Sequence, residues 1–436
     1  MSNIKKSGIE KDTHDDKDNT LQIQSDKKLL KQLARVVGLY DTRNNDIMNI
    51  TLKPSPILKS DYLSLKKLQP KLNLMYYRLT KDLKSYKFDE PMNKFLYDIF
   101  FEKEKTKKED VIALYFRSDY LLDNDQYKQV EINTISQCFN FLGPRINRIH
   151  SLMYPNVEVS NSDKKFVNFI ISIKKYYELK NNIKNTVIVM VDNTTGVNNS
   201  NYMEKIQLIE AFLCSGIHLR HVTIEELENK KDKEEDKLEN IYYQNERVSI
   251  IYYRWFYNFE HFDDKSKIIR KDLELANVIN LPSIEFQIIN SKLFQVILSD
   301  KLNLYTEETN EISNYFGEFI LNKERFEKRK LEEKIKADDW LEKSVDEGGN
   351  SINKGKSNSI FMKKFNSATV KNMFIYDKSE REIINEVSIF GCLLIVDDKI
   401  IINDEAGYIV RSKDKRNLEG GICSGNGALD SLTLIE

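Results

Sequence analysis

Residues 186–222 read TVIVMVDNTTGVNNSNYMEKIQLIEAFLCSGIHLRHV, and this stretch predicts the type of fold. Its first six residues are almost wholly apolar, which is typical of a buried strand. A polar loop follows, and residues 202–213 then predict a helix that ends before Gly216. Residues 217–222 form a second apolar strand. A strand, a helix and a strand in this order are typical of an α/β unit.

The flanks of this unit have a different pattern. Helical spacing of apolar residues predicts helices around Pro91, and the charged segment 322–339 predicts an exposed helix. Apolar runs predict the strands 111–116, 127–135, 248–257, 360–364, 369–376, 386–396, 400–403 and 408–413. Asp397-Asp398 predicts a turn. Residues 1–28 are polar without periodicity, so we expect a disordered tail. Together, these predicted elements indicate an α+β / α/β protein.

Composition excludes several classes of function. The chain has 436 residues, with 67 Lys+Arg against 68 Asp+Glu, so it has no electrostatic footprint for nucleic acid. The apolar runs are too short to span a bilayer, and the first 19 residues lack the core of a secretory signal. The four cysteines contain no CxxC pair, which argues against a disulfide framework and against zinc. We therefore expect a cytoplasmic protein without a membrane or nucleic-acid partner.

Two segments could bind phosphate and metal. The loop 343–350, KSVDEGGN, combines a lysine, acids and two glycines, which suits a phosphate-binding loop or an ordinary charged turn. Alternation along residues 128–135 places Gln129, Glu131 and Asn133 on one strand face. Oxygen ligands at this spacing suit Mg²⁺, and a half-exposed edge strand gives the same pattern. The residues alone leave both alternatives open.

Three arginines, Arg117, Arg254 and Arg411, end or interrupt apolar strands. Such cations either recognise carboxylates and phosphates at the edge of a sheet or form structural ion pairs. The histidines lack metal spacing, and no serine or cysteine nucleophile motif is present. The residues therefore favour phosphoryl or metal-ion chemistry without a covalent enzyme intermediate.

Eight blocks of this chain, taken in order, resemble eukaryotic glutathione synthetases, which are ATP-grasp ligases. The blocks are F-R-S-D-Y (116–120), Q-V-E-I-N-T-I-S (129–136), Y-Y-R-x-x-Y (252–257), Lys292 opening a helix, K-x-x-x-E-G-G-N (343–350), M-x-K (362–364), E-V-S-I-F-G (386–391) and R-S-K-(x)5-E-G-G (411–421). Because all eight blocks occur in the order of the family, the resemblance outweighs the structural alternatives given above for the single blocks. The resemblance implies an ATP-grasp fold with an inserted three-layer α/β substrate-binding domain and an antiparallel β C-terminal part. The implied units are 29–184 and 291–436 for the ATP-grasp domain, with lid and glycine-rich loops in the second, and 185–290 for the substrate-binding domain.

The resemblance also implies the site residues and their roles. It implies two Mg²⁺ per active site, with the ligands Glu131, Asn133 and Glu347. Its ATP contacts correspond to Glu131, Lys292, Lys343, Glu347, Gly348, Gly349, Asn350, Met362, Lys363, Lys364, Phe365, Glu386, Lys413 and Glu419. Its contacts to the two amino-acid substrates correspond to Arg117, Ser136, Cys138, Asn199, Asn201, Lys205, Arg254, Tyr257, Arg411, Ile422 and Cys423. Of these, Arg411 and Arg117 correspond to catalytic residues.

The implied reaction is ATP- and Mg²⁺-dependent ligation of γ-glutamylcysteine to glycine through an acyl phosphate, the last step of glutathione biosynthesis. The implied protein is a homodimer. This chain departs from the family on the substrate side, at Cys138, Asn199, Lys205, Trp255-Phe256 and Cys423. Two alternatives follow: ligation of the same donor to another small amino acid such as β-alanine, or an inactive nucleotide-binding relative that acts as a scaffold. The retained metal ligands and Arg411 argue against the scaffold.

Overall fold

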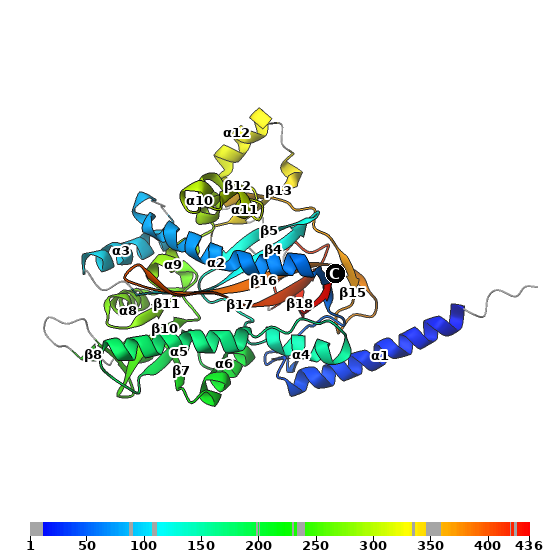
Figure 1. Cartoon of the computed structure of the whole chain (residues 1–436), viewed down its shortest axis with the longest axis horizontal. Coiled ribbons are helices and arrows are strands. Elements are labelled where there is room, and N and C mark those ends of the chain that lie inside the picture. The colour runs from blue at the N-terminus through cyan, green and yellow to red at the C-terminus, as the bar shows by residue number, and fades with distance from the viewer. Residues whose placement is uncertain are drawn as a thin grey trace, which may run out of the picture.

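The main sheet of the molecule is six-stranded and antiparallel, in the order β18-β17-β16-β4-β5, with β15 paired to β16 (Figure 1). The computed structural model describes residues 12–86, 90–106, 111–197, 199, 201–228, 231–232, 240–333, 336–345, 359–418, 420–422 and 425–436. The strands of the main sheet are β4 (Val111–Asp123), β5 (Gln126–Asn133), β15 (Val370–Asn372), β16 (Arg381–Val396), β17 (Lys399–Asp414) and β18 (Gly427–Asp430).

The two longest strands, β16 and β17, form a hairpin at the centre of this sheet. Asp397 and Asp398 make the predicted turn, and both have the positive φ that tight hairpin turns require. The sequence predicts two strands, 400–403 and 408–413, where the structure has one. Between them, Ala406 and Gly407 form a bulge opposite Phe390, and Gly407 has a φ of 96°. A bulge bends the strand without ending it, which is why the alternation fails there.

Both faces of the main sheet are buried. Alternate residues of β4 contact two different cores: Ile112 and Leu114 face one, and Ala113 and Tyr115 face the other. Helix α2 (Lys59–Lys81) covers the first face, and helices α4 (Gly143–Met153) and α5 (Ser162–Lys180) cover the second. Gly391 lets α2 approach closely, because a Cβ there would lie 2.4 Å from the Asn73 side chain.

The segment 186–222 forms the predicted α/β unit. Strand β6 (Val187–Asp192), helix α6 (Tyr202–Cys214) and strand β7 (Leu219–Thr223) are its parts, and β6 lies parallel to β7 and to β10 (Glu246–Tyr253). Strand β11 (Ile279–Leu281) continues the sheet in parallel beyond β10. Ile188 and Met190 face helices α5 and α6, whereas Val189 and Val191 face helix α8 (Asp264–Leu275). The unit therefore has three layers, helix on sheet on helix.

A smaller sheet, β12-β14-β13, lies with helix α12 at one end of the molecule (Figure 1). Its parts are β12 (Phe319–Leu321), α12 (Lys323–Glu333), β13 (Trp340–Ser344) and β14 (Ser359–Lys363). The other helices are α3 (Pro91–Lys105), α7 (Glu225–Glu228), α9 (Ile284–Ile289), α10 (Leu293–Lys301) and α11 (Thr309–Ser313). The other strands are β1 (Tyr40–Asp41), β2 (Asp46–Ile47), β3 (Ser55–Leu58), β8 (Lys231–Asp232), β9 (Asn240–Tyr243) and β19 (Leu432–Ile435). Among the described residues, none of the helices combines the length and the apolar character needed to cross a membrane.

The N-terminal segment differs from the expected tail over residues 1–28. Helix α1 (Asp12–Val36) begins inside that segment, and its N-terminal half extends away from the body (Figure 1). The C-terminal half is anchored because Leu30 and Ala34 are fully buried, with Ile23 packed against the same core. The tail prediction was therefore wrong from Asp12 onward, because this helix depends on tertiary contacts of a few residues in a mostly polar segment.

Candidate functional site

The centre of the candidate site is a buried cluster of charges on the main sheet. Arg117 donates to both oxygens of Asp119, from Nε at 2.7 Å and from Nη2 at 2.9 Å. Arg411 donates to Asp119 at 2.7 Å and also to Glu386. Two of the predicted arginines and one predicted glutamate therefore meet around a carboxylate that is fully buried.

The acids of this cluster differ in their pKa. Burial alone would raise the pKa of Asp119, but the guanidinium groups of Arg117 and Arg411 hold it below the usual value. Burial raises the pKa of Glu386, against the opposing effect of Arg411, and the charge of Asp119 adds to the rise. Two acids therefore face two arginines, and Glu386 takes up a proton more readily than Asp119 does.

The predicted metal ligands of β5 lie beside this cluster. In register, Glu131 is opposite Asp119, and Asn133 is opposite Arg117. The Asn133 amide donates to Asp119 at 3.0 Å through its nitrogen, which leaves its oxygen for another partner. Within the described ranges, no three His, Cys, Asp or Glu side chains form a metal cage. An oxygen pair without a cage fits Mg²⁺, which is usually held by one or two carboxylates together with substrate phosphates.

Lysines gather on the same side. Burial lowers the pKa of Lys343, on β13, and the nearby Glu131 carboxylate acts in the opposite direction. Lys292 and Lys413 act on the same pKa as like charges, so each lies near enough to Lys343 for its charge to affect that group. A group of lysines beside oxygen ligands is suited to phosphates. The predicted phosphate contacts are thus brought together with the predicted metal ligands.

Other predicted residues of the nucleotide side lie on or just after β14, or outside the described residues. On β14, Met362 is buried, whereas Lys363 is exposed and pairs with Glu318 at 3.1 Å. The next residues, Lys364 and Phe365, follow the strand. Six further predicted site residues lie outside the described residues: Glu347, Gly348, Gly349, Asn350, Glu419 and Cys423.

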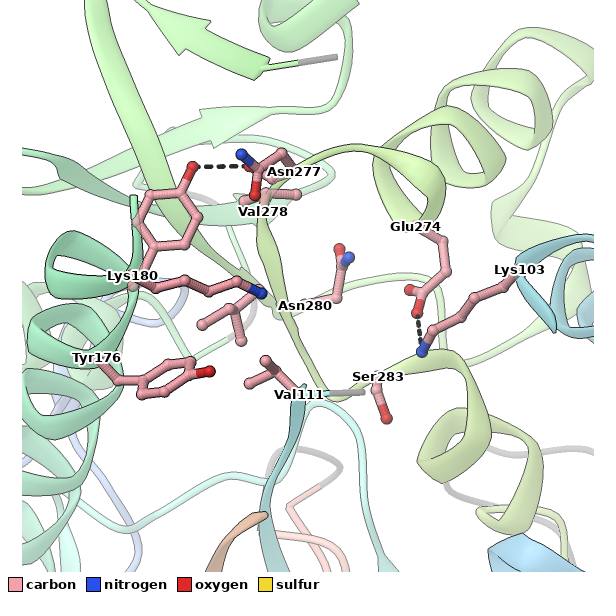
Figure 2. A pocket seen from close by; sticks show the side chains of 11 residues that line it. Lys103, Val111, Tyr176, Lys180, Glu274, Asn277, Val278, Asn280 and Ser283 are labelled. Atoms are coloured by element: carbon pink, nitrogen blue, oxygen red, sulfur yellow. Dashed lines mark hydrogen bonds and ion pairs between the residues drawn. The ribbon is translucent and has the colours of Figure 1, made fainter. Parts of the chain in front are cut away.

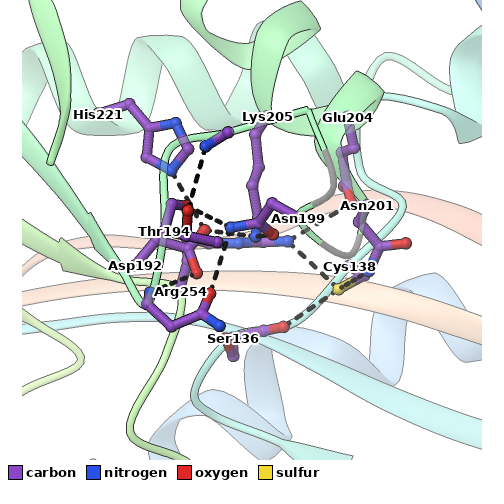
Figure 3. A network of polar contacts seen from close by, with 12 residues as sticks. Ser136, Cys138, Asp192, Thr194, Asn199, Asn201, Glu204, Lys205, His221 and Arg254 are labelled. Atoms are coloured by element: carbon purple, nitrogen blue, oxygen red, sulfur yellow. Dashed lines mark hydrogen bonds and ion pairs between the residues drawn. The ribbon is translucent and has the colours of Figure 1, made fainter. Parts of the chain in front are cut away.

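The predicted substrate residues form a second cluster, next to the first (Figure 3). Cys138 links the two, because its carbonyl accepts from Arg117 at 3.2 Å and its sulfur accepts from Arg254 at 3.2 Å. Asn201 donates to the same sulfur at 3.1 Å, and Cys138 donates to the Ser136 carbonyl. The second cluster therefore continues from the charge centre toward helix α6.

Lys205 is buried in this second cluster and does not turn toward water. Its ammonium group pairs with Asp192 and donates to Asn199, and 4% of the residue is exposed. Burial lowers the pKa of Lys205, while Asp192 acts to raise it. Asp192 also contacts His221 Nε2 at 3.2 Å. Lys205 therefore has an acidic partner of its own inside the protein.

Two predicted residues have surroundings that the sequence did not indicate. Tyr257 packs its ring edge-on against Trp255 and His261, and it lines a cavity together with Ile135 and Val345. The side chain of Ile422 is buried in the core beneath the sheet. Any contact of Ile422 with a substrate would therefore use its backbone.

A separate pocket lies at the start of β4, near Val111 (Figure 2). Arg117 is six residues further along this strand, or about 20 Å at the usual rise per residue. Lys103 lies at the pocket and pairs with Glu274 at 3.2 Å. The pocket is therefore distinct from the two clusters.

Three acids of the site were not predicted as site residues. Asp119 holds both arginines, Asp192 holds Lys205, and Glu204 accepts from the Phe139 backbone and faces Arg254 at 3.5 Å. Asp192 had a usable signal, because it is the first polar residue after the apolar run of β6, where ligand sites collect in α/β sheets. Asp119 also had a signal, because it lies two residues after Arg117 in the block F-R-S-D-Y, whereas Glu204 had none.

Comparisons with known proteins identify the family of this chain. A model of the eukaryotic glutathione synthase ATP-binding domain matches residues 40–434. The glutathione synthetase large chain of Schizosaccharomyces pombe is 25% identical over 457 residues, covering 89% of this chain and 91% of that one. The glutathione synthetase of Dictyostelium discoideum is 25% identical over 450 residues, covering 89% and 92%. The apo structure of a glutathione synthetase-like effector from Globodera pallida has a TM-score of 0.73 at 16% identity, covering 94% of this chain and 96% of that one. The family model spans most of the chain, and this protein belongs to the eukaryotic glutathione synthase family.

Proposed function

We propose that this protein is an ATP-dependent ligase that joins γ-glutamylcysteine to glycine and so forms glutathione. The family model supports use of ATP, and the relatives named above support the reaction class. The observation that carries the proposal is the charge centre, in which Arg117, Asp119 and Arg411 meet beside Glu131 and Asn133. The proposal includes an ATP-grasp fold, two Mg²⁺ ions, a homodimer and a cytoplasmic location.

The reaction needs no side-chain nucleophile. The donor's cysteinyl carboxylate attacks the γ-phosphorus of ATP, the bond to the β-phosphate oxygen breaks, and ADP leaves. The acceptor's amine then attacks the acyl carbon of the acyl phosphate, inorganic phosphate leaves, and the amine loses a proton. Both steps transfer groups between substrates, so the protein contributes position and charge.

The lysines and the ligands of β5 would hold the phosphates. Lys292 lies near enough to Lys343 for its charge to lower the pKa of that group, and both are suited to phosphate oxygens. Glu131 and Asn133 would hold Mg²⁺, together with Glu347. When bound, Mg²⁺ neutralises charge on the phosphates.

Arg411 is suited to the acyl phosphate. Its Nη2 is held by Asp119 and Glu386, which fixes the guanidinium group, and its Nε–H is buried without a protein partner. A fixed donor costs little reorganisation when negative charge develops on the acyl oxygen. We assign to Arg411 the stabilisation of the acyl phosphate and of the tetrahedral intermediate, and to Arg117 the orientation of the carboxylate.

The test is ADP release from the full chain with ATP, Mg²⁺ and γ-glutamylcysteine, with glycine, β-alanine or no acceptor. Release that depends on glycine supports the proposal. Release that depends on β-alanine supports the alternative of another small acceptor. Binding of ATP without release in any arm would contradict a ligase and favour a scaffold.

A further inference from the structure

The far end of the donor site, which is the end away from Arg117 and Arg411, has an unusual arrangement of charged side chains. The second cluster begins at Cys138, beside the charge centre, and ends at Asp192, the last residue of β6, with Lys205 of helix α6 and His221 of β7 beside it (Figure 3). In open α/β sheets, ligands bind at the carboxyl ends of the strands. A donor whose reacting carboxylate lies at Arg117 and Arg411 therefore extends its other end toward Lys205.

Each acid that the described residues place around this end already has a cationic partner. Asp192 is 1% exposed and pairs with Lys205, and Glu204, equally buried, faces Arg254. Asp41 lines a small cavity with Asn199 and Asn201, and Arg43 binds both of its oxygens, at 3.0 and 2.8 Å.

The loop 193–201 adds no further acid. It reads NTTGVNNSN, so its two residues outside the described part, at 198 and 200, carry no charge. An ammonium group that entered here would lose its water without gaining a carboxylate, next to the like charges of Lys205 and Arg254. Both effects oppose its binding.

The same end has donors for an anion. The Nε–H of Arg254 is buried without a protein partner. Lys205 has three N–H groups and donates to two partners, Asp192 and Asn199. A carboxylate would satisfy both donors with charge-assisted hydrogen bonds.

We propose that this protein recognises the far end of its donor through a carboxylate alone. Its donors are then N-acylcysteines whose acyl chain ends in a carboxylate, and an amino group on that chain contributes nothing to recognition. This inference rests on the proposed ligase function and specifies its donor class.

The test compares γ-glutamylcysteine with N-glutarylcysteine, which has the same carbon chain without the amino group. The readout is kcat/KM for ADP release from the full chain with glycine as acceptor. We expect N-glutarylcysteine to be used at least as efficiently as γ-glutamylcysteine. A lower kcat/KM for N-glutarylcysteine would overturn the inference and leave the ligase function intact.

Lys205→Gln supplies a second test. Removing the ammonium group frees the Asp192 carboxylate, so the ratio of kcat/KM for γ-glutamylcysteine over N-glutarylcysteine should rise at least tenfold. Lys205→Arg keeps the charge and should keep the ratio of the parent protein. Lys267→Gln, which removes a surface pair with Asp264 in the same unit, is the matched control. An unchanged ratio in folded Lys205→Gln would overturn the inference.

Calorimetric titration separates the two proposals. Each donor is titrated into the full chain with Mg²⁺ and a non-hydrolysable ATP analogue, so binding is measured without turnover. Equal or tighter binding of N-glutarylcysteine supports the inference even where ADP release fails. Tighter binding of γ-glutamylcysteine, or binding of neither donor, overturns it.

Discussion

Arg411 on β17 donates to Asp119 on β4 at 2.7 Å, across the strand β16 that separates them. The strand between them contributes Glu386, which is opposite Arg411 in register and accepts from the same guanidinium group. Three strands therefore each supply one charged side chain to a single network. The four predictions below follow from this network, from the ligands beside it and from a second buried network behind the sheet.

Asp119→Asn should destabilise the protein and impair ligation. The change leaves Arg117 and Arg411 buried with one carboxylate fewer, and breaking a buried pair typically costs roughly 3–5 kcal/mol. Urea denaturation measures the loss, and ADP release measures the activity. The control is Asp125→Asn, which changes an exposed aspartate on the same hairpin. Equal stability of the two variants would show that the arginines do not depend on Asp119.

Arg411→Ala should lower kcat as well as kcat/KM. If Arg411 stabilises charge that exists mainly in the transition state, removing its charge-assisted hydrogen bond of about 1.5–3 kcal/mol costs roughly 10- to 150-fold. Steady-state kinetics with γ-glutamylcysteine and glycine measure the change. Arg411→Lys keeps the charge, so its kcat should lie between the kcat of the parent protein and that of Arg411→Ala. A change confined to KM would mean that Arg411 only binds the substrate.

Glu131→Ala and Glu347→Ala should each abolish ligation and leave the fold intact. Each change removes a carboxylate from the proposed Mg²⁺ site, and the nearby lysines then face the phosphates without the cation. ADP release at saturating Mg²⁺ measures activity, and circular dichroism checks the fold. Glu342→Ala, on β13 beside Lys343, is the acidic control. Activity near that of the parent protein in either variant would remove the metal assignment.

His150 should make stability depend on pH. The ring is fully buried, contacts Ser431 and the Thr51 carbonyl, and burial lowers its pKa to about 4, against 6.5 for the unfolded chain. As the pH falls from 6.5 to about 4, the unfolded chain takes up the proton first, so the free energy of unfolding should fall by roughly 3 kcal/mol.

The matched variant for this prediction is His150→Gln, measured by urea denaturation at several pH values. Burial raises the pKa of Asp430, which lies next to Ser431, so Asp430 acts in the opposite direction as the pH falls. Because both proteins keep Asp430, the difference between their pH profiles isolates His150. Parallel profiles would contradict the prediction.

The sequence predicted the elements better than their pairing. The apolar run of β6, the helix α6 and the β16–β17 turn are confirmed, because each follows from a local pattern of side chains. The bulge at Gly407 and the helix from Asp12 were missed. Both depend on contacts with residues far away in the chain, which local periodicity does not contain.

The prediction of the site shows the same division between what a local pattern indicates and what contacts between distant residues decide. Arg117 and Arg411 were predicted to lie at the reacting end, and the structure places both on Asp119. For Lys205, the resemblance implied only a contact with the substrate. The structure shows instead a buried pair with Asp192, because helix α6 runs back along the sheet and its first turn lies at the carboxyl end of β6, which brings two residues 13 positions apart into contact.

The sequence by itself determined most of the strands and helices, the family and the residue types of the site, because each of these follows from the local order of residues along the chain. The tertiary structure decided which charges neutralise one another. Asp119 and Arg411 are separated by most of the chain and meet because β4 and β17 flank β16 in one sheet. The energy of a charge in a protein depends on its distance from other charges and from water, and both distances are set by folding.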